Sequence, residues 1–268
     1  MTAIPPILLV GCGRMGGAML AGWRERGLAP SIAVDPAPDA ARMAGADLTV
    51  VGDASIIPAD FSPAAVVLAV KPQNAAEALP PHARHAGRAV FLSIMAGRTI
   101  GGIRGLLGES AAVVRAMPNT PAAVRQGVSV ACAGPGVSEP QRTLCERLLQ
   151  AIGVVAWADD EALLDPVTAV SGSGPAYVFL LAEMMEQAAV EQGIPPDLAR
   201  LLARQTVAGS GALLAASTED AAALRRAVTS PGGTTAEALR VLMAPDAWPA
   251  AMRRAIAEAT RRSRELAG

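Results

Sequence analysis

The stretch ILLVGCGRMGGAM, residues 7–19, decides the fold of this chain. An apolar run leads into Gly11, Gly13 and Gly16 in G-x-G-x-x-G spacing, and helical spacing follows. In this strand–turn–helix context Gly11 allows a tight turn, Gly13 lets a pyrophosphate approach the backbone, and Gly16 allows close helix–strand packing. The start of the helix adds free amide groups and a positive dipole. The stretch therefore predicts a dinucleotide site made by Gly11, Cys12, Gly13, Arg14, Met15 and Gly16.

Strand-like and helix-like segments alternate over the first 158 residues. The segments at 65–70 and 89–95 are continuously apolar, which is typical of strands buried on both faces of a parallel sheet. Ser138 and Gln141 have capping-box spacing and indicate the start of a helix. We therefore expect an α/β fold class, with an N-terminal Rossmann-type doubly wound sheet. The strands are predicted at residues 7–11, 32–35, 65–70, 89–95, 111–117, 127–133 and 154–158.

The chain after about residue 160 is predicted to be all-helical. Its first long helix, YVFLLAEMMEQAAVEQG at 177–193, is apolar around most of its circumference, as a fully buried helix is. A region of this size cannot surround such a helix alone, so we expect an obligate homodimer. The predicted domains are a dinucleotide-binding Rossmann domain at 1–158 and an all-α C-terminal dimerisation domain at 159–268. The other helices are predicted at 196–217, 219–228, 235–243 and 248–266.

Composition excludes several classes of protein. A formal net charge of −1 gives no reason to expect nucleic acid as a partner, and we interpret RRSRE near the C-terminus as a solvated helix face. We expect no signal peptide and no membrane span, because the apolar runs are short and the first lacks a basic flank. The three cysteines are widely spaced, which indicates buried residues in a reducing compartment and not a metal site. We therefore expect a cytoplasmic protein without a bound metal.

The two histidines are predicted to lie on the surface. His82 and His85 are part of the polar stretch PPHARH, and histidine is often exposed. This placement removes the commonest general acid–base side chain from the candidate site.

Asp35 ends the second predicted strand, 24 residues after Gly11. A carboxylate there can accept a hydrogen bond from the 2′-hydroxyl of an adenosine ribose, and it repels a 2′-phosphate. The position favours NADH over NADPH, although Arg42 is near in sequence. The alternative is a turn aspartate before Pro36.

Further candidate residues follow other predicted strands, whose carboxyl ends line the ligand crevice of such a sheet. Lys71 is the only lysine, while the other 22 basic residues are arginines, which suggests a site that a guanidinium does not fit. Asn119 offers a polar group for a nicotinamide carboxamide or a substrate. The cofactor contacts expected at these ends are Ala69, Val70, Lys71, Pro72, Met95, Ala96, Gly97 and Asn119.

Two loops in the second half are rich in small polar residues. AVSGSGPAYVF at 169–179 places Ser171 and Ser173 at a helix entrance, where a close helix–helix contact is an equally good interpretation. TSPGGTT at 229–235 has no charged residue and lies between two predicted helices. Its hydroxyls, its open backbone amides and the following helix start can hold a carboxylate.

The motifs GCGRMG, AVKPQ, RAMPNTPAAV, AVSGSGPAYVF and LRRAVTSPGGTTAEAL together resemble the pyrroline-5-carboxylate reductase family over nearly the whole chain. The resemblance implies reduction of the imine L-1-pyrroline-5-carboxylate to L-proline with NAD(P)H, and interlocked helical halves in a homodimer that can assemble further. Family members often use NADPH well, and Asp35 departs from the small or polar residue common at its place. The substrate would be bound by Ser230, Gly232, Gly233, Thr234 and Thr235, and we expect catalytic roles for Thr235, Lys71 and Ser171.

Two alternatives are distinguishable. The 3-hydroxyacid dehydrogenases share the glycine motif but use a lysine in the helical half, and this chain has no lysine after residue 71. A nucleotide-sensing protein without catalysis is compatible with the fold. An assay of NAD(P)H oxidation with pyrroline-5-carboxylate separates this alternative from a reductase.

Overall fold

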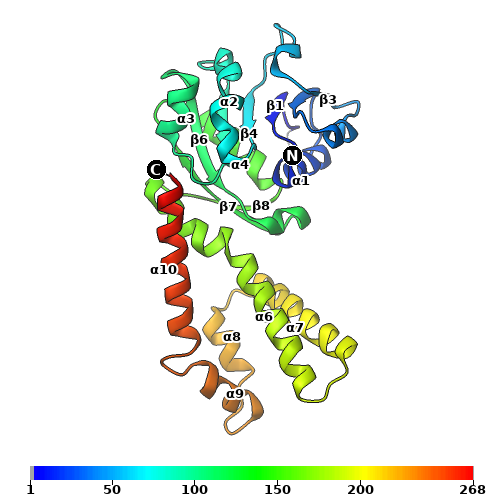
Figure 1. Ribbon diagram of the computed structural model, residues 1–268, viewed down its shortest axis with the longest axis vertical. Helices are drawn as coiled ribbons and strands as arrows, with labels where there is room; N and C mark the ends of the chain where they lie inside the picture. The colour runs from blue at the N-terminus through cyan, green and yellow to red at the C-terminus, as the bar shows by residue number, and fades with distance from the viewer. Residues whose placement is uncertain (1–2, 268) are drawn as a thin grey trace. The chain divides into compact units, whose positions relative to one another are not determined.

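One sheet of eight strands, in the order β3-β2-β1-β4-β5-β6-β7-β8, dominates the first part of the chain (Figure 1). It is seen in a computed structural model that describes residues 3–267. Neighbouring strands are parallel except β6 and β7. The order reverses between β1 and β4, which confirms the predicted doubly wound architecture. The strands are β1 (Ile7–Val10), β2 (Ser31–Val34), β3 (Leu48–Val51), β4 (Ala65–Leu68), β5 (Val90–Ser93), β6 (Ala112–Met117), β7 (Gly127–Ala133) and β8 (Gly153–Trp157).

Strand ends and one whole strand differ from the sequence prediction. The segment predicted as a strand at 65–70 ends at Leu68, because the chain turns away from the sheet there. β3 was not predicted, because it lies at the edge of the sheet and only Leu48 of its four residues LTVV is buried, so it lacks the continuous apolar run of the central strands.

Both faces of the sheet are buried, because alternate side chains of its central strands point to opposite sides. On one face Leu9 and Val67 pack with residues of α1 (Arg14–Glu25) and α4 (Glu139–Gln150). On the other face Leu8 and Val66 pack with residues of α2 (Ala75–Ala78) and α3 (Ile100–Leu107). This three-layer packing explains the continuously apolar strands.

The prediction that the histidines lie on the surface is wrong. Both belong to η4 (Pro80–His85), and the exposed fractions of His82 and His85 are 1% and 6%. The proline pair starts a short 3₁₀ helix that packs beside α3, so its histidines turn inward. Burial, with smaller contributions from His85 and Arg84, lowers the pKa of His82 to about 4. His82 is therefore a neutral core residue at pH 7.

Helices form the rest of the chain, as predicted. Residues Ser173–Glu258 form one compact unit, and the remaining described residues form the other. The short helices η6 (Glu161–Leu163), α5 (Leu164–Val167) and the π-helix η7 (Thr168–Gly172) belong to the sheet unit. The domain boundary after residue 158 stays a prediction. The later helices are α6 (Gly174–Glu191), α7 (Pro196–Ala216), α8 (Ala221–Ala227), α9 (Thr234–Leu242) and α10 (Trp248–Ala267).

The helical unit has almost no core within a single chain. Among Ser173–Glu258 only Ala199 and Ala203 are buried, and α6 has no buried residue. Phe179 of α6 is 68% exposed and Leu201 of α7 is 60% exposed. The sequence of α6 predicts a buried helix. Because α6 is exposed in a single chain, a second chain is needed to cover it.

Membrane-spanning helices and clusters of metal ligands are both absent from residues 3–267. No helix there combines the length and apolarity needed to cross a membrane. No group of three or more histidine, cysteine or acidic side chains there could hold a metal ion.

Candidate functional site

In the turn between β1 and α1, Gly11 and Gly16 could not be replaced by another residue without a shift of the backbone. Gly11 has a φ of +97°, and a Cβ there would lie 2.8 Å from the carbonyl of Ala69. A Cβ on Gly16 would lie 2.3 Å from the Gly11 carbonyl oxygen. A Cβ on Gly13, in contrast, would meet no atom within 4 Å, and Gly13 is the N-cap residue of α1, without a side-chain cap. The turn therefore leaves the amide end of α1 open beside a tightly packed backbone, which suits a pyrophosphate.

The Asp35 carboxylate lies against this glycine turn. Its Oδ2 accepts a hydrogen bond from the Cys12 backbone N–H at 2.6 Å, and its Oδ1 accepts one from the Ala37 N–H at 2.9 Å. Asp35 is thus a turn residue as well as a candidate ribose ligand. Burial, and then the charge of Asp35, raise the pKa of the Cys12 thiol to about 11, so the thiol stays protonated.

Arg42 is already paired in this structure. Its Nη2 lies 3.2 Å from Oδ1 of Asp39, and both side chains are largely exposed. An ion pair this exposed contributes at most about 1 kcal/mol.

The loops after β4 and β5 are joined by Arg98, whose Nε donates to the Pro72 carbonyl oxygen at 2.9 Å. Lys71 is exposed on the first loop. On the second, Gly97 has a φ of +68°, and a Cβ there would lie 3.0 Å from the Leu266 carbonyl oxygen. The two loops thus form one connected edge at the carboxyl ends of neighbouring strands. It carries the predicted contacts Ala69, Val70, Lys71, Pro72, Met95, Ala96 and Gly97.

Asn119 and Ser171, 52 residues apart in sequence, are in direct contact. Asn119 is 9% exposed, and its Nδ2 donates to the Ser171 carbonyl oxygen at 3.1 Å. Its Oδ1 accepts from the Val128 N–H at 2.9 Å. The Ser171 hydroxyl donates to the Val167 carbonyl oxygen at 3.0 Å. Both ends of the Asn119 carboxamide are therefore engaged within the protein.

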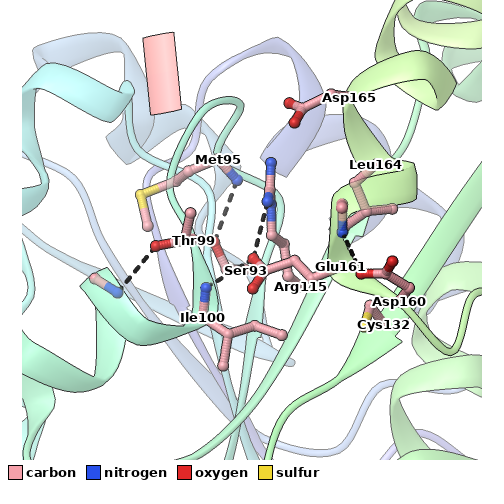
Figure 2. Close-up of polar contacts among 12 residues, drawn as sticks. Ser93, Met95, Thr99, Ile100, Arg115, Cys132, Asp160, Glu161, Leu164 and Asp165 are labelled. Carbon is pink, nitrogen blue, oxygen red and sulfur yellow. Dashed lines mark hydrogen bonds and ion pairs between the residues drawn. The ribbon is translucent and has the colours of Figure 1, made fainter. Parts of the chain in front are cut away.

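A buried ion pair beside this region was missed from the sequence. Arg115 of β6 is 5% exposed, and its Nη1 donates to Oε1 of Glu161 at 2.8 Å (Figure 2). The same oxygen accepts from the Ile100 N–H at 2.8 Å. Glu161 thus connects β6, the start of α3 and the turn after β8. The available signal was an arginine inside the apolar strand AVVRAM, since a buried cation needs a partner.

Glu161 and Asp160 also affect the pKa of Cys132, which Figure 2 places beside them. Burial raises the pKa of the Cys132 thiol first, and the charges of Glu161 and Asp160 raise it further. This environment opposes formation of a thiolate.

The SPGGTT loop forms one turn at the start of α9, within the helical unit. Gly232 has a φ of +69°, and the Gly233 N–H donates to the Ser230 carbonyl oxygen at 3.0 Å. Gly233 is the N-cap residue of α9 and provides no side-chain cap, and Thr234 is exposed. The nearest acid in the helix, Glu237, is paired with Arg240 at 3.0 Å. The predicted substrate residues Ser230, Gly232, Gly233, Thr234 and Thr235 are therefore brought together at an open helix start.

Family models match parts of both the sheet-forming and the helical halves of the chain. Residues 161–266 match the family model described as pyrroline-5-carboxylate reductase dimerisation, and residues 6–97 match the model described as NADP oxidoreductase coenzyme F420-dependent. The chain is 39% identical to pyrroline-5-carboxylate reductase of Pseudomonas aeruginosa, over 98% of this chain and 97% of that protein. It is 36% identical to the Haemophilus influenzae enzyme, over 88% of each.

A solved structure of a pyrroline-5-carboxylate reductase from Coxiella burnetii is similar over 99% of both chains, with a TM-score of 0.91 and 30% identity. The likeness in sequence and in structure thus covers both compact units. The chain belongs to the pyrroline-5-carboxylate reductase family.

Proposed function

We propose that this protein reduces the cyclic imine L-1-pyrroline-5-carboxylate to L-proline, with NAD(P)H as the hydride donor. The observation that carries the proposal is a likeness to curated pyrroline-5-carboxylate reductases that spans both the glycine turn and the SPGGTT loop. Either feature alone would be weaker support, because the fold hosts many reactions.

The residues at the glycine turn fit a dinucleotide. The backbone amides at the start of α1 would hold the pyrophosphate. Gly11 lies too close to Ala69 for a side chain, so no side chain at position 11 would obstruct the pyrophosphate. The Met95–Gly97 loop and the exposed Lys71 lie at the adjoining strand ends, where they would contact the rest of the nucleotide. The bound nucleotide supplies the hydride.

The SPGGTT loop would bind the substrate carboxylate. Hydroxyls of Ser230, Thr234 and Thr235 and the first amides of α9 supply donors without a fixed positive charge. Each charge-assisted hydrogen bond to a carboxylate contributes about 1.5–3 kcal/mol. A neutral donor set also avoids holding the product as strongly as an arginine would.

Ser171 has a proposed role toward the imine nitrogen. Its hydroxyl proton is committed to the Val167 carbonyl, so the oxygen offers lone pairs and acts as an acceptor. A protonated imine is an N–H donor, and such an acceptor would orient it for hydride transfer. The neutral, buried His82 is unsuited to supply the proton, so protonation is assigned to solvent or to an imine that binds already protonated. Positioning and exclusion of water would then supply most of the rate enhancement.

The nucleotide preference is proposed to be NADH. A carboxylate at the end of β2 beside the glycine turn accepts from a ribose hydroxyl and repels a 2′-phosphate.

The assembly is proposed to be a homodimer through the helical unit, with higher assembly of dimers left open. The exposed apolar faces of α6 and α7 lie within the residues that match the dimerisation model. A cytoplasmic location is proposed on the three free, buried cysteines, which suit a reducing compartment.

A spectrophotometric assay tests the function. The purified protein is mixed with pyrroline-5-carboxylate and NADH or NADPH, and L-proline is identified as the product. Turnover with at least one nucleotide is expected. Nucleotide binding without turnover would identify a nucleotide-sensing protein and overturn the proposal.

A further inference from the structure

The π-helical turn η7 joins α5 to α6 and carries Ser171. π-turns are rare, hold their backbone less regularly than an α-helix, and occur often at functional sites. Two side chains of this turn donate to carbonyls four residues earlier: Thr168 to Leu164 at 2.7 Å and Ser171 to Val167 at 3.0 Å. Such bonds compete with the regular helix ladder. The geometry of the turn therefore depends on contacts from outside it.

Asn119 supplies such a contact from the loop after β6. Its Nδ2 donates to the Ser171 carbonyl oxygen, while its Oδ1 is fixed by the Val128 N–H of β7. The carboxamide thus bridges a strand and the π-turn. Next to it, a Cβ on Gly172 would lie 2.8 Å from Cε of Met117, so the turn also packs tightly on the end of β6.

Only an amide meets both requirements at this site. An aspartate of the same shape still accepts from Val128 but places an anion against the Ser171 carbonyl. An alanine provides neither bond. Glutamine adds a methylene at a position that is 9% exposed.

We propose that Asn119 is a positioning residue. It holds the π-turn on the sheet and thereby fixes the Ser171 hydroxyl, and its carboxamide does not bind the nicotinamide. The inference rests on the proposed role of Ser171 in the reductase reaction.

The kinetic test uses Asn119→Asp, Ser171→Ala and the double variant. Asn119→Asp is expected to lower kcat at least tenfold with the nucleotide Kd within twofold of the parent protein. If Asn119 acts through Ser171, the double variant is expected to have a kcat close to that of the slower single variant. Multiplicative losses, or a nucleotide Kd raised tenfold, would overturn the inference.

A second measurement needs no variant. The chain contains only two asparagines, Asn74 and Asn119, so side-chain amide labelling of asparagine gives two pairs of NMR signals. Asn74 is exposed, so the buried Asn119 amide is identified by its slower exchange with solvent. With saturating NAD⁺, the rate at which the Asn119 side-chain amide exchanges with solvent is expected to stay unchanged. Its chemical shift is expected to change little. A large shift of that signal would show direct contact with the nucleotide and refute the positioning role.

The two tests separate this inference from the proposed function. If the parent protein has no turnover with pyrroline-5-carboxylate, the proposed function fails. If turnover is present and the Asn119 signal responds strongly to nucleotide, only the positioning role fails.

Discussion

The Asp35 carboxylate accepts a hydrogen bond from the backbone N–H of Cys12 at 2.6 Å. Asp35, which follows β2, therefore contacts the glycine turn and is also the candidate ligand of an adenosine ribose. A substitution can remove the charge of Asp35 and keep its hydrogen bond with the Cys12 N–H, so the two effects can be tested separately.

Asp35→Asn removes the charge and keeps an oxygen that can accept from Cys12. The ratio of kcat/KM for NADPH to that for NADH is expected to rise at least tenfold, equivalent to about 1.4 kcal/mol. Steady-state kinetics with both nucleotides measure the ratio. Asp53→Asn, an exposed turn aspartate bonded to Ser55, is the matched control and should leave it unchanged. Equal ratios in the parent protein and Asp35→Asn would contradict the ribose role.

Thr235→Ala is expected to raise the KM for pyrroline-5-carboxylate about tenfold or more, because one charge-assisted hydrogen bond is lost. Nucleotide affinity should stay within twofold. Thr229→Ala in the same loop is the control, since the Thr229 hydroxyl is committed to the Arg225 carbonyl at 2.7 Å. A KM that is the same in both variants would remove Thr235 from the carboxylate site.

Phe179→Glu is expected to dissociate the dimer, because it places a charge on a side chain of α6 that is 68% exposed in one chain. Light scattering should report a monomer or aggregation at concentrations where the parent protein is dimeric. Ile56→Glu, at a position 61% exposed in the sheet unit, should remain a dimer. An intact Phe179→Glu dimer would place the interface elsewhere.

Stability is expected to fall as the pH drops from 6.5 to 4. Burial lowers the pKa of His82 from 6.5 to about 4, so the unfolded chain binds a proton in this window that the folded chain excludes. The contribution of the neutral side chain is complete above pH 6.5, and its loss amounts to about 3 kcal/mol by pH 4. His82→Leu should flatten this dependence, because it removes the titrating imidazole. The substitution loses no hydrogen bond at Nδ1, since that atom of His82 is buried without a partner. Melting temperatures across the window measure both slopes, and equal slopes would assign the acid sensitivity to other groups.

The predictable part of the site was its backbone. The turn at Gly11 and Gly16 could be anticipated, because the positive φ of Gly11 and the contact of Gly16 with the Gly11 carbonyl oxygen lie within one strand–turn–helix segment. The close approach of Gly11 to Ala69, which follows β4, was not local and could not be anticipated. The capping box at Ser138 was confirmed for the same reason: Ser138 N–H donates to Oε1 of Gln141 at 3.0 Å. The open start of α9 followed from glycines next to a helix-like segment.

The unpredictable part was the choice of side-chain partners. His82 appeared polar and exposed in sequence, and only the packing of η4 beside α3 buries it. Asn119 had a recognisable polar group, but its partner Ser171 lies 52 residues away. The strand Leu48–Val51 lies at the edge of the sheet with one buried residue, so its sequence lacks the apolar run that marks the central strands.

The sequence by itself determined the Rossmann-type sheet, the helical second half and the need for a partner chain. Glycine spacing and hydrophobic periodicity encode such features within one or two turns of chain. Only the tertiary structure decided that Arg115 pairs with Glu161, that His82 is buried, and that Asn119 donates a hydrogen bond to the Ser171 carbonyl oxygen. These contacts join segments tens of residues apart, and they are selected by the packing of whole elements, which local propensity does not encode.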